Sequence, residues 1–342
     1  MIKKISITII VTLLLAIATV TFLSIVGIET TKFNNFIKNE LKSYNNKTDI
    51  NLKKVKLKLD LKNFYIKINT LDPTLYYNSI EFPLEKLSFS IAIKSYLNEE
   101  FGIKKASIEI KYNKITNFLN TYQSETGSVQ FFILSKTLKK GDVKFVVDFE
   151  FDEKGKINNN YIINGEIKDT KIKIFKDYDF NHLNFDFKIK KNNYEISDAS
   201  FNFNNINFNS KKISIIKNNE DHQVIGEIDN KDGFLNDKIL HIFSKNYENY
   251  LDIDNSKITS NSSFSFDITK DFKIKKLKTH SRVKIDKLGY LSKYKKIKKY
   301  LPDYQDKIYF NDSLIEISYF KNNYKFEGSA NYSLNDLSDK LN

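Results

Sequence analysis

The sequence predicts a mostly β protein, in which a long curled antiparallel sheet forms a repeating β-groove behind an N-terminal transmembrane helix and a few amphipathic helices. Three observations lead to this fold class. The chain opens with a long uncharged apolar run, most of the remaining chain alternates between apolar and polar residues, and helical spacing is confined to a few segments. With 342 residues, 41% of them hydrophobic, the chain is long enough to bury a core.

The N-terminal segment predicts a membrane anchor. The run from Ile5 to Ile28 contains no charged residue, and about 20 apolar residues suffice to cross a bilayer. Lys3 and Lys4 precede it and, by the positive-inside rule, hold the N-terminus in the cytoplasm. We therefore expect a single-pass inner-membrane protein whose bulk lies in the periplasm of a Gram-negative cell. A cleaved signal peptide is the alternative, because AIA at 16–18 has a small-x-small form; the apolar run continues past this site, which favours a retained anchor.

An amphipathic helix is predicted directly after the anchor. Apolar and aromatic residues recur there on one helical face, while lysines lie away from it. The face consists of Phe33, Phe36, Ile37, Leu41 and Tyr44. Such a helix either lies on the outer leaflet or caps the folded domain. The predicted organisation is thus an anchor at 1–28, an amphipathic helix at the membrane at 29–47, and a periplasmic β-groove domain at 48–342.

Period-two alternation dominates the chain from Ile50 onward. It is clearest in VKLKLDL, LSFSIAI, SIEIKY, VKFVVDFEFD, LNFDFKIK, FSFDI and LIEISY. One side of each run is apolar and the other is polar, which is typical of an antiparallel sheet with one face in water. We expect about twenty such strands, interrupted by helices at Asp232–Leu251 and Lys287–Leu301.

The segment SFNFNNINFNS at 200–210 shows the one-sided pattern most clearly. If Asn204 and Asn205 form a two-residue hairpin turn, the apolar residues on either side face each other across two strands. If they form a bulge within one strand, the extra residue again keeps the apolar side chains on one face. Asparagine suits either geometry because it adopts left-handed backbone conformations more readily than most residues.

No motif in the sequence indicates catalysis, a metal or a cofactor, and we expect a protein that is not an enzyme. The four histidines lie in separate predicted elements, the chain has no cysteine, and zinc-protease, nucleophile-elbow and nucleotide-binding motifs are absent from the sequence. The net charge of +13 arises from 55 basic residues spread among 42 acidic ones, so we expect no nucleic-acid partner. The basic run KYKKIKKY at 293–300 is interpreted as the solvated face of an amphipathic helix.

The apolar face of the predicted sheet needs a cover, which is a second sheet, helices, lipid or a partner. The predicted helices are too few to cover it, and 10 glycines and 3 prolines are few for the corners of a sandwich. The remaining solution is a curled trough that solvates acyl chains. The candidate groove-lining residues are Leu57, Leu59, Phe89, Phe145, Val147, Phe149, Phe185, Phe187, Phe201, Phe203, Phe208, Phe264, Phe266 and Ile317.

Several segments resemble a known superfamily. The lysine-flanked anchor, VGIETTKFNNFIKNEL, INLKKVKLKLDLKNFYIKINTLDPTLYYNSIEFPLEKLSFSIAIKSYL and FGIKKASIEIKY resemble the N-terminal part of the AsmA-like envelope proteins, the superfamily of AsmA, TamB and YhdP. KYLPDYQDKIYFNDSLIEISYFKNNYKFEGSANYSL is similar to their strand-rich middle. The resemblance implies a β-groove, anchored in the inner membrane, that carries phospholipid toward the outer membrane. The proteins of this superfamily are generally longer, so we expect this chain to be a truncated gene, a fragment, or a subunit that needs an outer-membrane or periplasmic partner to complete the bridge.

The sequence therefore predicts a protein that binds and transfers phospholipid along a hydrophobic groove between the inner and outer membranes. The alternative is a membrane-tethered scaffold or assembly factor for outer-membrane proteins, whose sheet edge pairs with client strands. A hydrolase with a site that carries no recognisable motif is a third hypothesis; it requires a pair of titratable groups clustered in a pocket.

Overall fold

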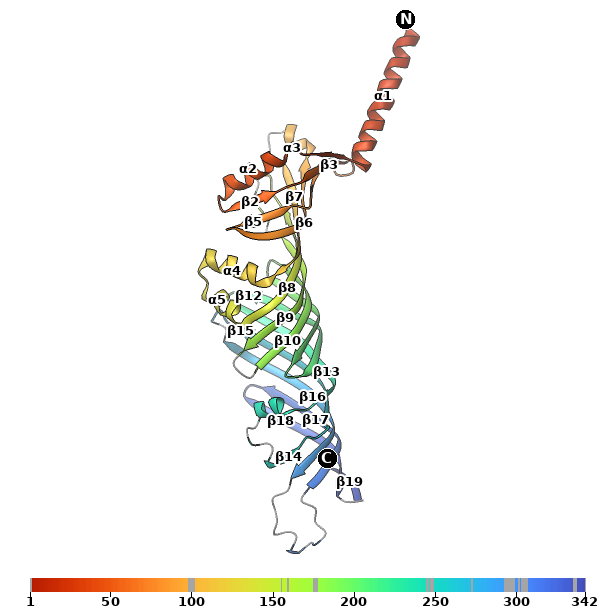
Figure 1. Cartoon of the computed structure of the whole chain (residues 1–342). Coiled ribbons are helices and arrows are strands. Elements are labelled where there is room, and N and C mark those ends of the chain that lie inside the picture. The colour runs from red at the N-terminus through yellow and green to blue at the C-terminus, as the bar shows by residue number, and fades with distance from the viewer. Residues whose placement is uncertain are drawn as a thin grey trace. The chain divides into compact units, whose positions relative to one another are not determined.

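Strands make up most of the chain, and the helices are few and mostly short. The computed structural model describes residues 2–97, 102–154, 156–158, 160–174, 178–243, 246, 249–271, 273–291, 299–300, 302, 307–334 and 337–341. The helices are α1 (Ile2–Ile25), α2 (Asn34–Tyr44), α3 (Ile93–Leu97), α4 (Ile115–Thr126), α5 (Val129–Thr137) and α6 (Asp237–Phe243) (Figure 1). The strands are β1 (Ile28–Thr30), β2 (Thr48–Asn51), β3 (Lys54–Asp60), β4 (Tyr65–Leu71), β5 (Thr74–Tyr77), β6 (Ile80–Ala92), β7 (Ile103–Lys114), β8 (Leu138–Glu150), β9 (Ile162–Ile174), β10 (Tyr178–Lys190), β11 (Asn193–Phe203), β12 (Ile206–Asn218), β13 (Asp221–Phe234), β14 (Leu251–Asp252), β15 (Lys257–Ile268), β16 (Ile274–Leu291), β17 (Lys307–Phe320), β18 (Asn323–Leu334) and β19 (Leu337–Leu341).

The coarse fold class is confirmed: the chain is mostly β, its sheets are antiparallel, and an apolar helix stands at the N-terminus. All seven alternating runs fall in strands, namely β3, β6, β7, β8, β10, β15 and β17. The chain divides into two compact units. Unit 1 comprises residues 1–133, 142–166 and 188–191, and unit 2 comprises 134–141, 167–187 and 192–342.

Unit 1 contains α1 and a sheet in which β1, β3, β4, β6, β7 and β8 pair in that order, every pair antiparallel. The short strand β5 pairs with β2 and with the beginning of β6. A closed core lies where β2, β6 and β7 meet, formed by Ile50, Leu52, Leu84, Leu87 and Ile110. Ile37 and Leu41 of α2 pack against it.

Unit 2 contains a second run of antiparallel pairs, in which β11, β12, β13, β15, β16, β17, β18 and β19 pair in that order. The two-residue strand β14 pairs with the end of β16. Strands consecutive in the sequence are neighbours almost throughout, and two-residue turns join β11 to β12, β12 to β13 and β17 to β18, as expected for an antiparallel meander.

Paired residues with left-handed backbone form the hairpin turns where glycine is usual. Asn204 and Asn205 join β11 to β12 with φ of 46° and 68°, so this segment is a hairpin and not a bulge. Two positive φ values in a two-residue turn match the twist of the flanking strands. The Asn202 Oδ1 accepts a hydrogen bond from the Asn205 N–H at 3.0 Å, which fixes the turn. The same pair of left-handed residues occurs at 78–79 and at 321–322. This substitution of Asn, Ser and Lys for glycine explains how the chain turns with so few glycines.

Left-handed aspartates interrupt several strands of unit 2. Asp198 in β11, Asp232 in β13 and Asp312 in β17 have φ of 49°, 50° and 47°. The pairing register shifts beside Asp232 and Asp312, which identifies these positions as β-bulges. A bulge bends its strand and exchanges the faces to which odd and even residues point. In β11 the apolar residues change from even to odd numbers at the left-handed Asp198, although the register with β12 does not shift there.

Both helices predicted in the later half of the chain differ from the structure. Among the described residues of the segment Asp232–Leu251, only Asp237–Phe243 form an α-helix; residues 232–234 complete β13, and Leu251 begins β14. The Asn236 Oδ1 caps this short helix by accepting the Ile239 N–H at 3.2 Å. Residues 287–291 of the second segment belong to β16, where they pair with β17. Residues 292–298, and with them most of KYKKIKKY, lie outside the described residues. The first predicted helix is also shorter than 29–47, since β1 precedes it.

Candidate functional site

The predicted groove positions of unit 2 share one face of its sheet. Phe201 lies opposite Phe208 in the β11–β12 pair, and Phe203 lies opposite Ile206. On β15, Phe264 and Phe266 lie opposite Gly226 and Val224 of β13. Phe264 is in turn opposite Thr279 of β16, and Thr279 is opposite Tyr319 of β17, two residues from Ile317. Because side chains at paired positions point to the same side of a sheet, these residues form one surface, which we call the aromatic face of unit 2.

Neighbouring rings are in contact on the aromatic face. The ring centroids of Phe201 and Phe208 are 5.5 Å apart, with an angle of 16° between the planes. Gly226 makes room for two other side chains of this face: a Cβ there would lie 2.8 Å from the Phe264 ring and 2.9 Å from Ile213. The rings of Phe185 and Phe187 on β10 contact each other at 6.3 Å.

The aromatic face is half-buried and not closed. Phe201, Phe203, Phe208, Phe264, Phe266 and Ile317 all keep intermediate exposure. Three of their neighbours on the same face, Ile206, Val224 and Ala199, are buried. Within the described residues, the hydrophobic core cluster belongs to unit 1. The aromatic face of unit 2 is thus a packed layer that still presents apolar surface outward.

The predicted positions of unit 1 also share a face. Leu57, Ile68, Phe89, Ala106 and Phe149 occupy successive paired positions across β3, β4, β6, β7 and β8. The remaining three predicted positions are Leu59, Phe145 and Val147, which lie on the same side of β3 and β8. We call this surface the apolar face of unit 1.

A closed core covers part of the apolar face of unit 1. Phe89 and Phe145 pack against the core cluster, and the ring of Phe118 from α4 lies over Phe145 with a centroid separation of 5.2 Å. Val147 is 8% exposed. Leu57, Leu59 and Phe149 keep intermediate exposure. The structure therefore places twelve of the fourteen predicted residues on two faces, some of them against a protein core. The other two, Phe185 and Phe187, contact each other on β10.

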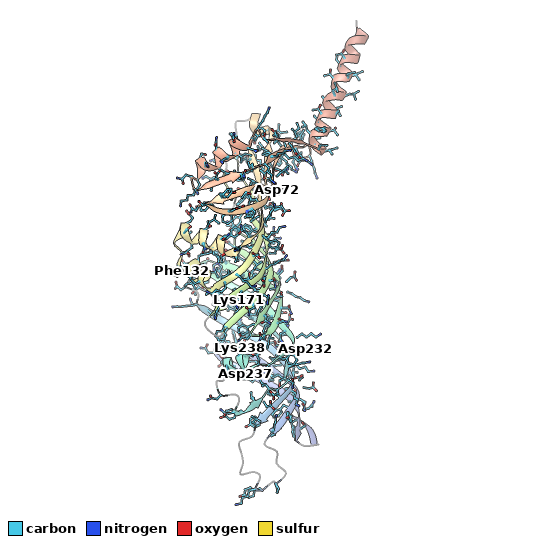
Figure 2. The ribbon with its side chains drawn as sticks, viewed as in Figure 1. Asp72, Phe132, Lys171, Asp232, Asp237 and Lys238 are labelled. Carbon is cyan, nitrogen blue, oxygen red and sulfur yellow. The ribbon has the colours of Figure 1, made fainter. Side chains whose placement is uncertain are left out.

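Charged side chains gather on the opposite faces and pair with one another. On unit 2, the Arg282 Nη2 lies 2.8 Å from the Glu316 Oε1, and the Lys212 Nζ lies 2.7 Å from Glu195. On unit 1, Asp72, labelled in Figure 2, lies 3.0 Å from the Lys111 Nζ. The hydrogen bond from Lys111 and the charges of Lys111 and Lys53 hold the pKa of the Asp72 carboxyl below its usual value. This segregation leaves the aromatic face and the apolar face free of these ion pairs.

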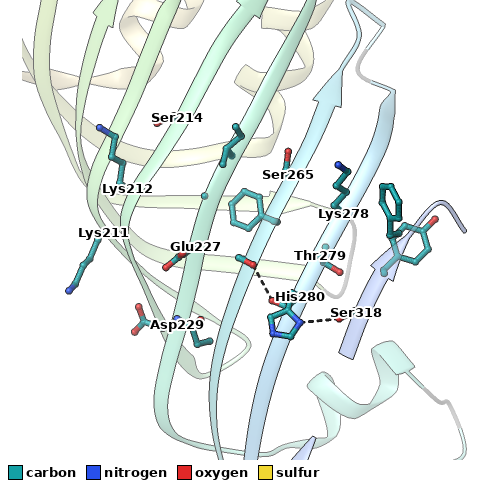
Figure 3. Close-up of a pocket in the computed structure, with 17 residues that line it drawn as sticks. Lys211, Lys212, Ser214, Glu227, Asp229, Ser265, Lys278, Thr279, His280 and Ser318 are labelled. Carbon is teal, nitrogen blue, oxygen red and sulfur yellow. Dashed lines mark hydrogen bonds between the residues drawn. The ribbon is translucent and has the colours of Figure 1, made fainter. Parts of the chain in front are cut away.

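A shallow hollow of about 780 Å³ lies on the polar face of unit 2 (Figure 3). It is lined by Lys212, Glu227, Ser265, Lys278, His280 and Ser318, among others. Within the hollow, the His280 Nδ1 lies 2.9 Å from the Ser318 Oγ, and the Lys278 Nζ lies over the Phe320 ring at 4.8 Å. Sequence reasoning missed this hollow, because it depends on which strands of the meander become neighbours.

The described residues include no group of three or more His, Asp or Glu side chains positioned to hold a metal ion. Comparisons with known proteins add no assignment. No family model, no curated protein and no solved structure matches this chain. The function must therefore be inferred from the sequence pattern and from the geometry of the two faces.

Two aromatic residues of the aromatic face were missing from the sequence prediction. The Phe180 ring lies 4.7 Å from that of Phe203, and the Tyr178 ring lies 6.2 Å from it. The signal that reveals them is alternation in YDFNHLNFDF, which changes from even to odd positions at His182. His182 has φ of 50°, so the backbone departs there from regular strand geometry. The neighbouring Asp169 carboxylate contacts the His182 Nδ1 at 2.8 Å.

Proposed function

We propose that this chain is a noncatalytic, membrane-anchored protein of the cell envelope that binds phospholipid on its aromatic face and transfers it between the inner and outer membranes. The observation that carries the proposal is the aromatic face of unit 2, a half-buried layer of Phe and Ile side chains. A continuous apolar surface that the chain leaves half-buried suits an apolar occupant. Burial stabilises an acyl chain by about 0.8 kcal/mol per CH₂ group, so a long chain gains much from such a surface.

The N-terminal helix supports the anchored part of the proposal. The segment Thr8–Ile25 is apolar enough to cross a membrane, and none of it is buried within the chain. The 24 residues of α1 span about 36 Å as a helix, and the hydrocarbon core of a bilayer is about 30 Å thick. With Lys3 and Lys4 in the cytoplasm, everything after α1 lies in the periplasm. The resemblance to the AsmA-like envelope proteins supports the same placement, and a partner protein that completes the bridge belongs to the proposal.

Phospholipid carried by the purified full-length chain tests the proposal. We expect mass spectrometry to detect phospholipid bound to the wild type, and a reduced amount on Phe203→Asp, because the new carboxylate would meet acyl chains without a partner. Asn207→Asp is the matched control: Asn207 is exposed and lies on the other face of the same hairpin, where its Oδ1 accepts from the Asn202 Nδ2. Thermal unfolding of both variants separates lipid loss from unfolding. Equal lipid on both variants, or none on the wild type, would contradict the proposal.

The second candidate function is a tethered assembly factor, and the edge of unit 2 favours it. Among the described strands, β19 pairs with β18 only over 330–334, and residues 323–329 have no partner on that side. Tyr324 and Phe326 on this segment are 66% and 64% exposed. An open strand edge with exposed aromatic residues suits the addition of a client strand. Crosslinks from position 326 to outer-membrane proteins, unaffected by Phe203→Asp, are the result that this function predicts.

A further inference from the structure

The turn between β3 and β4 exposes large apolar side chains. Its four residues, 61–64, which we call the hairpin tip, include Leu61 at 45% exposure and Phe64 at 68% exposure. Lys62 lies between them and is also exposed. Ile66, the next apolar residue on the apolar face of unit 1, is 39% exposed. Apolar surface thus continues from that face to the end of the hairpin.

Hydrogen bonds hold the hairpin tip, and its conformation is unfavourable for phenylalanine. The Asp60 carboxylate accepts hydrogen bonds from the Asn63 N–H and the Asn63 Nδ2 at 3.2 and 3.0 Å, and it pairs with the Lys67 Nζ at 2.7 Å. The Phe64 carbonyl accepts the Ile93 N–H at 3.0 Å. Phe64 has φ of 55°, where a side chain with a Cβ is strained. An exposed phenylalanine in a strained conformation gains no stability from contact with water. This indicates that the Phe64 side chain contacts something outside the protein.

The chain path places the hairpin tip beside the end of α1. The helix closes with the Val26 and Gly27 N–H groups donating to the Phe22 carbonyl, and β1 starts at the next residue. Gly27 has φ of 80° and lies so close to β3 that a Cβ would meet the Leu57 carbonyl oxygen and the Lys58 side chain. The hairpin tip begins three residues after Lys58, about 10 Å along the strand.

The direction of β3 places the hairpin tip at the level of the membrane that α1 is proposed to cross. Strand β1 leads away from α1, with Ile28 opposite Leu57 and Thr30 opposite Val55. Because β3 is antiparallel to β1, it runs back toward the level of α1 and presents the hairpin tip there. A helix of about 36 Å extends past a hydrocarbon core of about 30 Å, so its last turn lies in the headgroup region.

We infer that the hairpin tip inserts its Leu61 and Phe64 side chains into the outer interface of the membrane that α1 crosses, and thereby holds the open end of the apolar face of unit 1 at the bilayer surface. Lys58 and Lys62 meet the lipid phosphates, as cationic residues at a membrane interface do. The inference rests on the proposed function only in requiring that α1 cross a bilayer. It gives that function an entry point, because lipid leaving the bilayer would meet the apolar face first.

Fluorescent labels on single cysteines test the inference in the full-length chain. The chain has no cysteine, so each substitution labels one site. In vesicles of phosphatidylcholine and phosphatidylglycerol, we expect a polarity-sensitive label at Phe64→Cys to shift its emission to the blue and to be quenched by lipids with a nitroxide near the headgroup. Ser79→Cys is the matched control, because Ser79 is an exposed turn residue of unit 1 with φ of 65°. Ser79 directly precedes the first residue of β6. The other end of that strand, Ala92, pairs with Tyr65 next to the hairpin tip, so Ser79 lies at the strand end away from the tip. Its label should show neither change.

A second variant separates membrane contact from folding. Phe64→Asn should fold at least as well as the wild type, because Asn tolerates the left-handed conformation. A label at Lys62→Cys should lose its quenching by nitroxide lipids when Phe64→Asn is added. Equal quenching at positions 64 and 79, no quenching at 64, or quenching at 62 that survives Phe64→Asn would each overturn the inference. Insertion without bound phospholipid would refute the lipid-transfer proposal alone, and bound phospholipid without insertion would refute the docking of the hairpin tip alone.

Discussion

The Thr70 hydroxyl group joins β4 to β6 one residue past the last backbone pair of these two strands. The pairing of β4 with β6 ends at Asn69 and Ser88. One residue further, the Thr70 Oγ1 accepts the Leu87 N–H at 2.9 Å and donates to the Leu87 carbonyl at 3.2 Å. Thr70 is 1% exposed, so water cannot replace these bonds. The hydroxyl thus joins β4 to the residue of β6 that belongs to the closed core.

Thr70→Val keeps the shape of the side chain and removes both hydrogen bonds. We expect it to lower the free energy of unfolding by about 2 kcal/mol, since a buried backbone group left without a partner costs about 1–3 kcal/mol. Thr126→Val is the control, because Thr126 is exposed and a surface change is expected to stay within about 0.5 kcal/mol. Denaturant unfolding measures both, and equal values for the two variants would show that the bonds to Leu87 contribute nothing.

Asp60 makes the stability of unit 1 depend on acid pH. Its bonds from Lys67 and Asn63 hold the pKa of the carboxyl well below its ordinary value of 3.8. A lowered pKa in the folded state adds stability that is complete above the unfolded value and is lost as the pH falls through the folded value. Thermal unfolding of the wild type should therefore weaken below about pH 4. Asp60→Asn should show a smaller acid-dependent decrease, and an unchanged pH profile would contradict this assignment.

At the scale of elements, the β11–β12 hairpin was predictable and the helices were less so. The alternation around Asn204–Asn205 predicted the facing pairs Phe201–Phe208 and Phe203–Ile206, which the structure confirms for the hairpin geometry. The helices α4 and α5 were not predicted. The sequence of α4 does carry a local signal, since Ile115, Phe118, Leu119 and Tyr122 recur at helical spacing, whereas the apolar residues of α5 form no single face. The left-handed aspartates were equally hidden, although the change from even to odd apolar positions in β11 is a signal for Asp198.

The apolar side of α2 packs against the protein core. Ile37 and Leu41 pack against the core cluster, whereas Phe36 is 62% exposed. This arrangement favours the capping role among the two alternatives for the helix. Leu41→Ala should lower the free energy of unfolding by about 2 kcal/mol, near the lower end of the range for buried leucines because Leu41 is only partly buried. Phe36→Ala should change it by about 0.5 kcal/mol or less. If both variants lose stability equally, the helix does not cap the core as the contacts indicate.

At the scale of the molecule, the two units distribute apolar side chains differently. Unit 1 closes part of its apolar face with α2, α4 and a small core, whereas the aromatic face of unit 2 keeps half-buried rings. Sequence alternation predicted which residues share a face, because register and period two determine sidedness. It did not predict which part of that face a core would cover, because α2 and α4 pack on it through contacts distant in the chain. The proposal that this protein binds phospholipid concerns the apolar surface that no core covers.

Photocrosslinking from adjacent residues on opposite faces tests that claim most directly. A photoreactive amino acid replaces Phe208 or Phe266 on the aromatic face, and Asn207 or Ser265 on the polar face, in the full-length chain in its native membranes. We expect phospholipid adducts, identified by mass spectrometry, from positions 208 and 266 and not from 207 and 265. Equal adducts from both faces, no lipid adduct at any position, or adducts at 208 and 266 with protein alone would contradict the proposal that this face binds phospholipid.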